Sequence, residues 1–207
     1  MQSVTDPALK TTTYGYDNVG NRESVSYPNG NTTSYIYDTL NRLTRLTTTD
    51  TLLNTLVDFQ YSLDASGHRT QILENSGRVT DYLYDNLYRL TDETITDSIN
   101  GPYSAHYDYD AVGNRTYSNI NGVSTTYSYD DNDRLTSAGG ETYSYDANGN
   151  TIEKSIDGET SSYNYDAKNH LNDASLKNSG ITTNTSYSYD VDGIRISSAM
   201  TITPSPD

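Results

Sequence analysis

Polar and aromatic residues alternate along short stretches of this chain. Segments such as YSYD at residues 127–130 place a Tyr at every second position, and such spacing puts the rings on one face of a β-strand. No stretch keeps the 3.6-residue period of an amphipathic helix. The pattern predicts an all-β fold of tandem antiparallel β-hairpins, with no helix longer than one turn.

The alternation recurs as one motif, Tyr-x-Tyr-Asp, which occurs nine times and holds 17 of the 21 tyrosines. Repetition at such spacings is typical of arrays in which each unit packs on its neighbours. Positions are counted here from the motif Asp, so that the two tyrosines lie at −3 and −1. The motifs are YGYD (14–17), YIYD (35–38), YSLD (61–64), YLYD (82–85), YDYD (107–110), YSYD (127–130), YSYD (143–146), YNYD (163–166) and YSYD (187–190).

Two kinds of unit alternate. Gly-type units have Gly at +3 and Arg at +5, as in NVGNR after Asp17, whereas Arg-Leu-type units have Arg at +4 and Leu at +5, as in TLNRL after Asp38. The unit at Asp146 has lost its Arg, and His170 replaces Arg in the unit at Asp166. Steps from Gly-type to Arg-Leu-type units span 20 or 21 residues and the return steps 16 to 26, so the full period is a pair of units.

The residues after each motif predict a tight turn. Asp suits the first position of a type I turn, and the +3 residue then takes a positive φ. Gly, Asn or Asp occupies +3 in eight units and Tyr88 in the ninth. A type I turn with a Gly bulge places −1 opposite +5 and the Asp opposite +4. We expect this rule to be weakest at Tyr88 and in the YSLD unit.

This register predicts specific neighbours across each hairpin. Arg stems and Leu at +5 should pack on the −1 ring, with a cation–π contribution of about 0.5–1 kcal/mol from an exposed guanidinium. Charge pairs across the turn should each contribute about 0.2–1 kcal/mol. The predicted pairs are Tyr16–Arg22, Tyr37–Leu43, Tyr84–Leu90, Tyr109–Arg115, Tyr129–Leu135, Tyr165–Leu171 and Tyr189–Arg195, and the charge pairs Asp38–Arg42, Asp85–Arg89 and Asp130–Arg134.

The residues expected to hold the array together are motif tyrosines and aspartates, +3 glycines and the arginines that follow. They are Tyr14, Tyr16, Asp17, Gly20, Arg22, Tyr35, Tyr37, Asp38, Arg42, Tyr82, Tyr84, Asp85, Arg89, Tyr107, Tyr109, Asp110, Gly113, Arg115, Tyr127, Tyr129, Asp130, Arg134, Tyr187, Tyr189, Asp190, Gly193 and Arg195.

A second set of turns lies between the motifs. PNG (28–30), NSG (75–77), NG (121–122) and DG (157–158) are strong hairpin signals and imply two strands per unit. We therefore expect nine repeats over residues 14–197, with 1–13 and 198–207 as frayed or tethering flanks. No shift in composition marks a domain boundary.

Composition alone is misleading for this chain. A formal net charge of −15 with few aliphatic residues is typical of disorder, yet 21 tyrosines indicate an ordered sheet. With a pI near 4.3, the surface repels nucleic acid and anionic membranes. Cysteine is absent, and no segment has the pattern of a signal peptide or the length to insert in a membrane. Either the protein stays inside the cell or the chain is a mature or excised piece.

Candidate chemistry is sparse. The oxygen-rich turns DDND and DVDG offer weak calcium ligands, Asp130, Asp131, Asp133, Asp190 and Asp192, but neither supplies a complete calcium loop. Nine equivalent aspartates are typical of turns rather than of one catalytic constellation. His68 and His170 occupy +4, which predicts a cross-strand role, and no nucleophile signature is present. We expect no catalytic residue, resident metal or cofactor.

The repeated motif resembles the YD repeat of RHS (rearrangement hotspot) proteins over residues 14–195. The resemblance implies a role in large cell-surface or adhesion proteins, or in a hollow β-shell that encloses a toxin. Shell-forming relatives also carry a self-cleaving C-terminal segment, and nothing here matches it. The array would then be a twisted solenoid-like rod or a section of a β-shell wall.

Three functions remain open at this point. The first is a non-enzymatic structural scaffold, extracellular or exported, in which rod or fibre protomers associate end to end because neither terminal unit is capped. The second is a fragment of a toxin-encapsulating shell, joined to the remainder of a longer repeat chain. The third is a cell-surface adhesin whose Tyr rings bind glycans.

Overall fold

A computed structural model describes residues 2–204, which form nineteen β-strands and no helix. The all-β prediction is therefore confirmed. The chain divides into two compact units, Met1–Tyr107 with Asn119–Gly122 and Asp108–Ser118 with Val123–Asp207. Within the described range, no helix is present that could cross a membrane.

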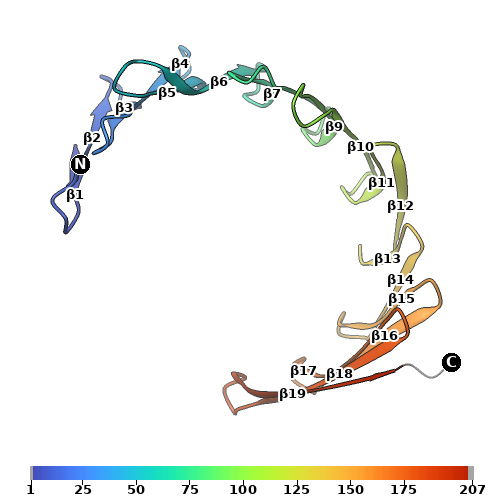
Figure 1. Cartoon of the computed structure of the whole chain (residues 1–207). Helices are drawn as coiled ribbons and strands as arrows, with labels where there is room; N and C mark the ends of the chain where they lie inside the picture. The colour runs from blue at the N-terminus through green and yellow to red at the C-terminus, as the bar shows by residue number, and fades with distance from the viewer. Residues whose placement is uncertain (1, 205–207) are drawn as a thin grey trace. The chain divides into compact units, whose positions relative to one another are not determined.

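In the first unit each strand pairs antiparallel with the next, so that the sheet follows chain order (Figure 1). Its strands are β1 (Ser3–Thr5), β2 (Thr11–Tyr16), β3 (Arg22–Ser26), β4 (Thr32–Tyr37), β5 (Leu43–Thr49), β6 (Thr55–Leu63), β7 (Arg69–Glu74), β8 (Val79–Tyr84), β9 (Leu90–Thr96) and β10 (Tyr103–Tyr109).

The second unit repeats this arrangement, and both β10 and β11 (Arg115–Ile120) contribute residues to the two units. Its other strands are β12 (Val123–Tyr129), β13 (Leu135–Ala138), β14 (Glu141–Tyr145), β15 (Thr151–Ile156), β16 (Glu159–Tyr165), β17 (Leu171–Asn178), β18 (Ile181–Tyr189) and β19 (Arg195–Pro204). Because consecutive strands run antiparallel, the motif turns all lie at the same ends of the strands, a side of each sheet called here the motif edge. The remaining turns lie at the opposite ends of the strands.

The predicted register is present in the described hairpins. Residues at −1 and +5 are direct partners in Tyr16–Arg22, Tyr37–Leu43, Leu63–Arg69, Tyr84–Leu90, Tyr129–Leu135, Tyr145–Thr151, Tyr165–Leu171 and Tyr189–Arg195. Tyr109–Arg115 stays a prediction. A second bulge was not predicted: Gly15 at −2 faces Ser24 at +7, so +6 is an extra residue.

The turn geometry is also as predicted. The +3 residue has a positive φ after every motif Asp, from 59° at Asp133 to 105° at Gly113. Its amide donates to the carbonyl of the motif Asp, and the Asp amide donates to the +4 carbonyl, as at Asp38 (3.0 and 2.9 Å). Tyr88 adopts φ 64°, and the YSLD unit keeps the register. The expectation that the rule weakens at these two places is therefore wrong.

The same turn also occurs where no motif precedes it. At Asp50 and Asp6 the Asp amide again donates to the carbonyl four residues on, at 3.0 Å in both. Leu53 and Leu9 take the positive φ, at 65° and 60°. Neither turn follows Tyr-x-Tyr, so neither was predicted, although an Asp followed four residues later by a donor was the available signal.

The flanks are more ordered than expected. Strand β1 pairs with β2 through Val4–Thr12, and β19 pairs with β18 as far as Pro204. The prediction of frayed flanks is therefore wrong for β1 and for residues 198–204, because strand pairing satisfies their backbone groups, and the tethering role stays a prediction. Residues 1 and 205–207 lie outside the described part.

The sheets bury little apolar surface. The buried apolar residues of the described chain are Val25, Ala105 and Ala174. Val25 and Ala174 lie at +8, where each is the direct partner of a −3 Tyr. Most motif tyrosines are half-buried, so the ordered interior consists largely of tyrosine rings lying over small residues.

Leu53 allows the cost of backbone strain to be isolated, because its side chain is 81% exposed and its φ is 65°. Replacing Leu53 with Asn should stabilise the protein by about 1 kcal/mol, since Asn tolerates the left-handed region. Urea unfolding measures the change. Leu52→Asn is the control, because Leu52 is 80% exposed and lies in the same turn without a positive φ. Equal effects of the two substitutions would contradict the strain interpretation.

Candidate functional site

The carboxylate of each motif Asp organises its turn. In the unit of Asp38, Oδ1 accepts hydrogen bonds from the amides of Leu40 (2.9 Å) and Arg42 (3.0 Å), and Oδ2 accepts one from Arg42 Nε (2.7 Å). The bond from the Arg42 amide lowers the pKa of Asp38 most, burial raises it, and the guanidinium lowers it further. Asp38 is therefore ionised in its structural role.

Different residues at +4 make the same contact with the carboxylate. The donor is an Asn amide in Asn21 (2.9 Å), a guanidinium in Arg42, and an imidazole Nδ1 in His68 (3.1 Å) and His170 (3.0 Å). The predicted charge pairs at Asp38, Asp85 and Asp130 are present at 2.6–2.7 Å. The cross-strand role predicted for His68 and His170 is confirmed.

Successive turns are joined along the motif edge of each sheet. In the first unit, Asn21 donates to Asn41 (3.0 Å) and Arg42 donates to the carbonyl of Asp64 (2.8 Å). In the second, Asn114 donates to Asp133 (2.9 Å) and Arg134 to the carbonyl of Asp146 (3.3 Å). Polar contacts of this kind thus connect successive hairpins within each unit.

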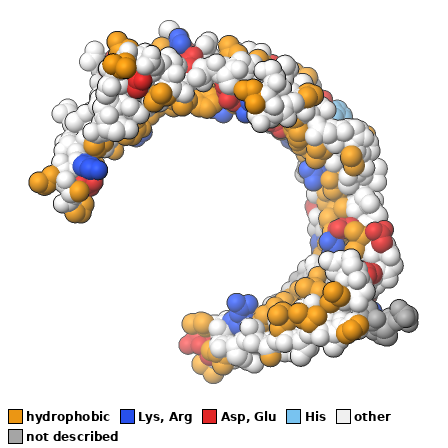
Figure 2. All heavy atoms as spheres, in the orientation of Figure 1, with side chains coloured by type: hydrophobic (Ala, Val, Ile, Leu, Met, Phe, Trp, Pro, Cys, Tyr) orange, Lys and Arg blue, Asp and Glu red, His pale blue; other side chains and the backbone are white. Residues whose placement is uncertain are grey.

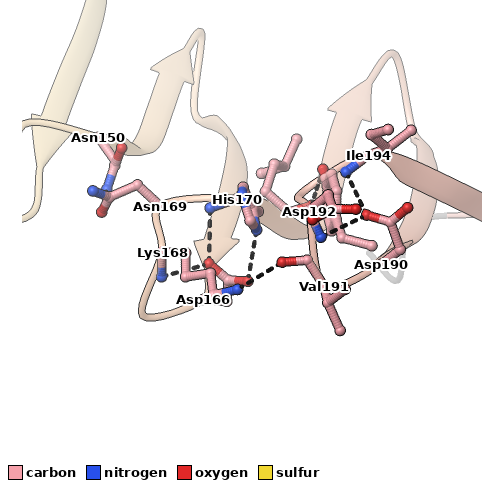
Figure 3. Close-up of polar contacts among 11 residues, drawn as sticks. Asn150, Asp166, Lys168, Asn169, His170, Asp190, Val191, Asp192 and Ile194 are labelled. Carbon is pink, nitrogen blue, oxygen red and sulfur yellow. Dashed lines mark hydrogen bonds and ion pairs between the residues drawn. The ribbon is translucent and has the colours of Figure 1, made fainter.

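Figure 3 shows this edge around Asp166. The His170 ring points to the Asp166 carboxylate, and Lys168 reaches the carbonyl of Val191 in the next turn (3.3 Å). His170 also stacks on Tyr189 with centroids 4.7 Å apart. At Asp190 the +4 residue is Ile194, which donates only its amide (2.9 Å).

The hydroxyl of the −1 Tyr has a role that the sequence did not reveal. Pairing between β3 and β4 stops at Ser24–Ser34, before the carbonyl of Arg22 at +5 finds a strand partner. The Tyr37 hydroxyl donates to this carbonyl (3.0 Å), and Tyr84, Tyr129, Tyr145 and Tyr189 make the same bond at 2.7–2.9 Å. A carbonyl without a strand partner still requires a hydrogen-bond donor, so Tyr rather than Phe suits this position.

One face of each sheet carries the motif tyrosines and is called here the tyrosine face. Guanidinium groups lie among its rings. The +5 Arg was expected to pack on the −1 ring, and in the structure its guanidinium lies over rings at −3. Arg69 is 4.3 Å from the centroid of Tyr61, and Arg115 is 4.6 Å from that of Tyr127. Arg22 lies between Tyr14 (5.6 Å) and Tyr35 (5.9 Å). Figure 2 shows hydrophobic side chains, tyrosines included, gathered over the strands from β16 to β18.

The opposite face holds one buried carboxylate. Asp58 is 7% exposed and accepts bonds from Arg45 Nε (2.7 Å), the Thr47 hydroxyl (2.7 Å) and Gln60 Nε2 (3.1 Å). The hydrogen bond from Arg45 is the main cause that lowers its pKa to about 2, against the effect of burial. The partners of its carboxylate all come from β5 and β6, so the cluster stabilises this hairpin.

Most of the carboxylates considered as calcium ligands already bond protein groups. Asp130 binds the Arg134 guanidinium (2.7 Å), Asp133 accepts from Asn114, and Asp190 accepts from the amide of Asp192 (3.0 Å). Among residues 2–204, no group of three or more His, Asp or Glu side chains could hold a metal ion. His106 pairs with Asp92 at 2.7 Å.

Two family models match these repeats. The RHS repeat model matches residues 2–32 and 19–52. The teneurin YD-shell model matches residues 66–200. The chain belongs to the teneurin YD-shell family. No protein with a curated description matches this YD-shell chain.

Solved structures share the fold. This YD-shell chain is similar to a chain in the Photorhabdus luminescens Tc holotoxin pore, with a TM-score of 0.65 and 17% identity. It is also similar to a chain in the crystal structure of TcdB2-TccC3, again with a TM-score of 0.65 and 17% identity. The alignments cover 92% of this chain but 13–14% of the neighbours. The YD-shell chain thus spans a small part of the length of those proteins.

The phenol bond can be tested with a pair of equivalent tyrosines. Tyr37→Phe should destabilise the protein by about 0.5–1.5 kcal/mol, because the carbonyl of Arg22 loses its donor. Tyr16 is also a −1 Tyr, but no motif hairpin precedes it. Its hydroxyl therefore has no +5 carbonyl of an earlier motif unit to bond. Tyr16→Phe should therefore change the unfolding free energy little. Equal losses for the two variants in urea unfolding would show that the hydroxyl bond is not the cause.

The Asp58 cluster predicts a pH dependence. Because the folded-state pKa of about 2 lies below the ordinary value of 3.8, its contribution is complete above pH 4 and is lost as the pH falls toward 2. Asp58→Asn should lower the free energy of unfolding by about 1–2 kcal/mol at pH 7. The difference in this free energy between the variant and the parent protein should narrow between pH 4 and pH 2. Asp131→Asn, at an exposed turn position, is the control. A gap that does not change with pH would contradict the assignment.

Proposed function

We propose that this chain is a section of the wall of an exported YD-shell protein, in which it serves as a non-enzymatic scaffold. The family match and the common fold with Tc toxin chains support a structural role. The proposed wall consists of hairpins that depend on their neighbours, joined to further repeats of a larger assembly.

The observation that carries this proposal is the link between successive hairpins. The hydroxyl of the −1 Tyr of one hairpin donates a hydrogen bond to the +5 carbonyl of the preceding hairpin, as Tyr37 does to Arg22. Side chains such as Arg42 bond the next turn. In a repeat array, stability comes from such contacts between nearest neighbours. Hydrogen bonds of this kind therefore suit an extended sheet that forms a wall. They position no group that would attack a substrate.

The second candidate is a fibre protomer that associates end to end, and the surface of β19 favours it. All ten residues of this strand are exposed, including Met200 (64%) and Ile202 (63%). No charged residue lies between Arg195 and Pro204. Long, uncharged strands of this kind are templates for pairing with another chain. Glycan binding by exposed tyrosines stays a prediction.

Sedimentation and electron microscopy of the purified chain distinguish the wall from the fibre. The wall proposal predicts discrete particles whose mass does not grow continuously with concentration. The fibre predicts filaments, which the double substitution Met200→Lys and Ile202→Lys should abolish. Ile36→Lys with Leu83→Lys, at exposed positions of internal strands (53% and 61%), is the matched control. Filaments that only the β19 variant abolishes would contradict the wall and favour the fibre.

A further inference from the structure

One Gly-type unit lacks the arginine that the other Gly-type units place among their tyrosines. At +5 the units of Asp17, Asp64, Asp110 and Asp190 have Arg, whereas the unit of Asp146 has Thr151. Thr151 is the direct partner of Tyr145, just as Arg22 is the direct partner of Tyr16. The backbone therefore presents Thr151 to the position where other units hold a guanidinium.

The tyrosines that would surround this missing guanidinium are all in place. Around Arg22 they are the −3 and −1 rings of its own unit and of the next, Tyr14, Tyr16, Tyr35 and Tyr37. The four equivalents around Thr151 are Tyr143, Tyr145, Tyr163 and Tyr165. Together with Thr151 and Lys154 they line a cavity of about 310 Å³.

We propose that this cavity is a binding site for the guanidinium of an arginine side chain carried by a segment of a partner protein. The occupant is inferred from the chain itself, which fills the corresponding positions with guanidinium groups 4.3–5.9 Å from ring centroids. Attraction between a cation and tyrosine rings is strongest where water is partly excluded, and these four rings are half-buried. The net charge of −15 further favours a cationic ligand.

The electrostatics of the −1 Tyr support the same site. Burial raises the pKa of Tyr37, Tyr84 and Tyr129, and in each a +5 Arg acts against the rise. Burial also raises the pKa of Tyr165, which Tyr163 and Asp146 raise further. An arriving guanidinium would supply the missing opposing charge.

Lys154 is the one cation that lines this cavity. Its ammonium binds Glu141 (2.9 Å) and lies 5.7 Å from the centroid of Tyr143. Tyr143 also donates to Glu141. The pair Lys154–Glu141 is neutral, and the Arg134 guanidinium already lies 4.9 Å from the centroid of Tyr145, so the rings of Tyr163 and Tyr165 are the ones left available. Removing the ammonium should nevertheless strengthen binding of a second cation, which gives the test a variant that gains function.

The probe is an acetylated and amidated Gly-Arg-Gly peptide, titrated into the full chain with labelled Tyr rings and followed by NMR. We expect a dissociation constant on the order of 1 mM, typical of a few cation–π contacts, with shifts confined to the four lining tyrosines and a lowered pKa for Tyr165. A peptide with citrulline in place of Arg has the same shape without the charge and should bind at least tenfold more weakly.

Substitutions separate this site from general attraction to an acidic surface. Thr151→Arg should abolish binding and raise the melting temperature, because the chain's own guanidinium fills the cavity. Thr142→Arg, on the opposite face of β14, should leave binding intact, and Lys154→Met should tighten it several-fold. Citrulline binding as strongly as arginine, Thr151→Arg retaining binding, or neither the parent protein nor Lys154→Met binding the peptide would each overturn the proposal.

Discussion

The hydrogen bonds of the motif carboxylate are the interaction on which this structure depends. One oxygen of Asp38 accepts two amides of its own turn, and the other accepts the side chain at +4. These bonds fix the turn type, and the turn fixes which residues face each other across the hairpin. A shift of one residue would move every Tyr to the other face. The register of each hairpin therefore follows from a local contact of a few residues.

The tyrosine face solves the problem of stabilising sheets with almost no aliphatic interior. The rings cover small residues such as Val25 and Ala174, and the guanidiniums lie over the rings. The phenol hydroxyls donate hydrogen bonds to backbone carbonyls where neighbouring hairpins diverge. Each of these contacts is modest, at about 0.5–1.5 kcal/mol. Several of them cross from one hairpin to the next, so a single hairpin would lack part of its support, which is why the motif is useful only in tandem.

Much of this fold could be read from the sequence because its determinants are local. The Asp, the +3 residue and the −1/+5 register lie within nine residues of each other, and all were predicted. The second bulge at +6, the link from Tyr37 to Arg22 and the Asp58 cluster could not be predicted, because they depend on how adjacent hairpins diverge or on partners from different strands. Strand β1 in the N-terminal flank was missed because the turn at Asp6 has no Tyr motif before it.

The central claim is that the motif carboxylate sets the register of its hairpin. Native-state hydrogen exchange after Asp166→Ala tests it most directly, with Asp192→Ala, at an exposed position of the next turn, as the comparison. The account predicts that Asp166→Ala abolishes protection at His170 and along the β16–β17 pairing, while Asp192→Ala leaves both intact. Unchanged protection of the β16–β17 amides in Asp166→Ala would contradict the claim.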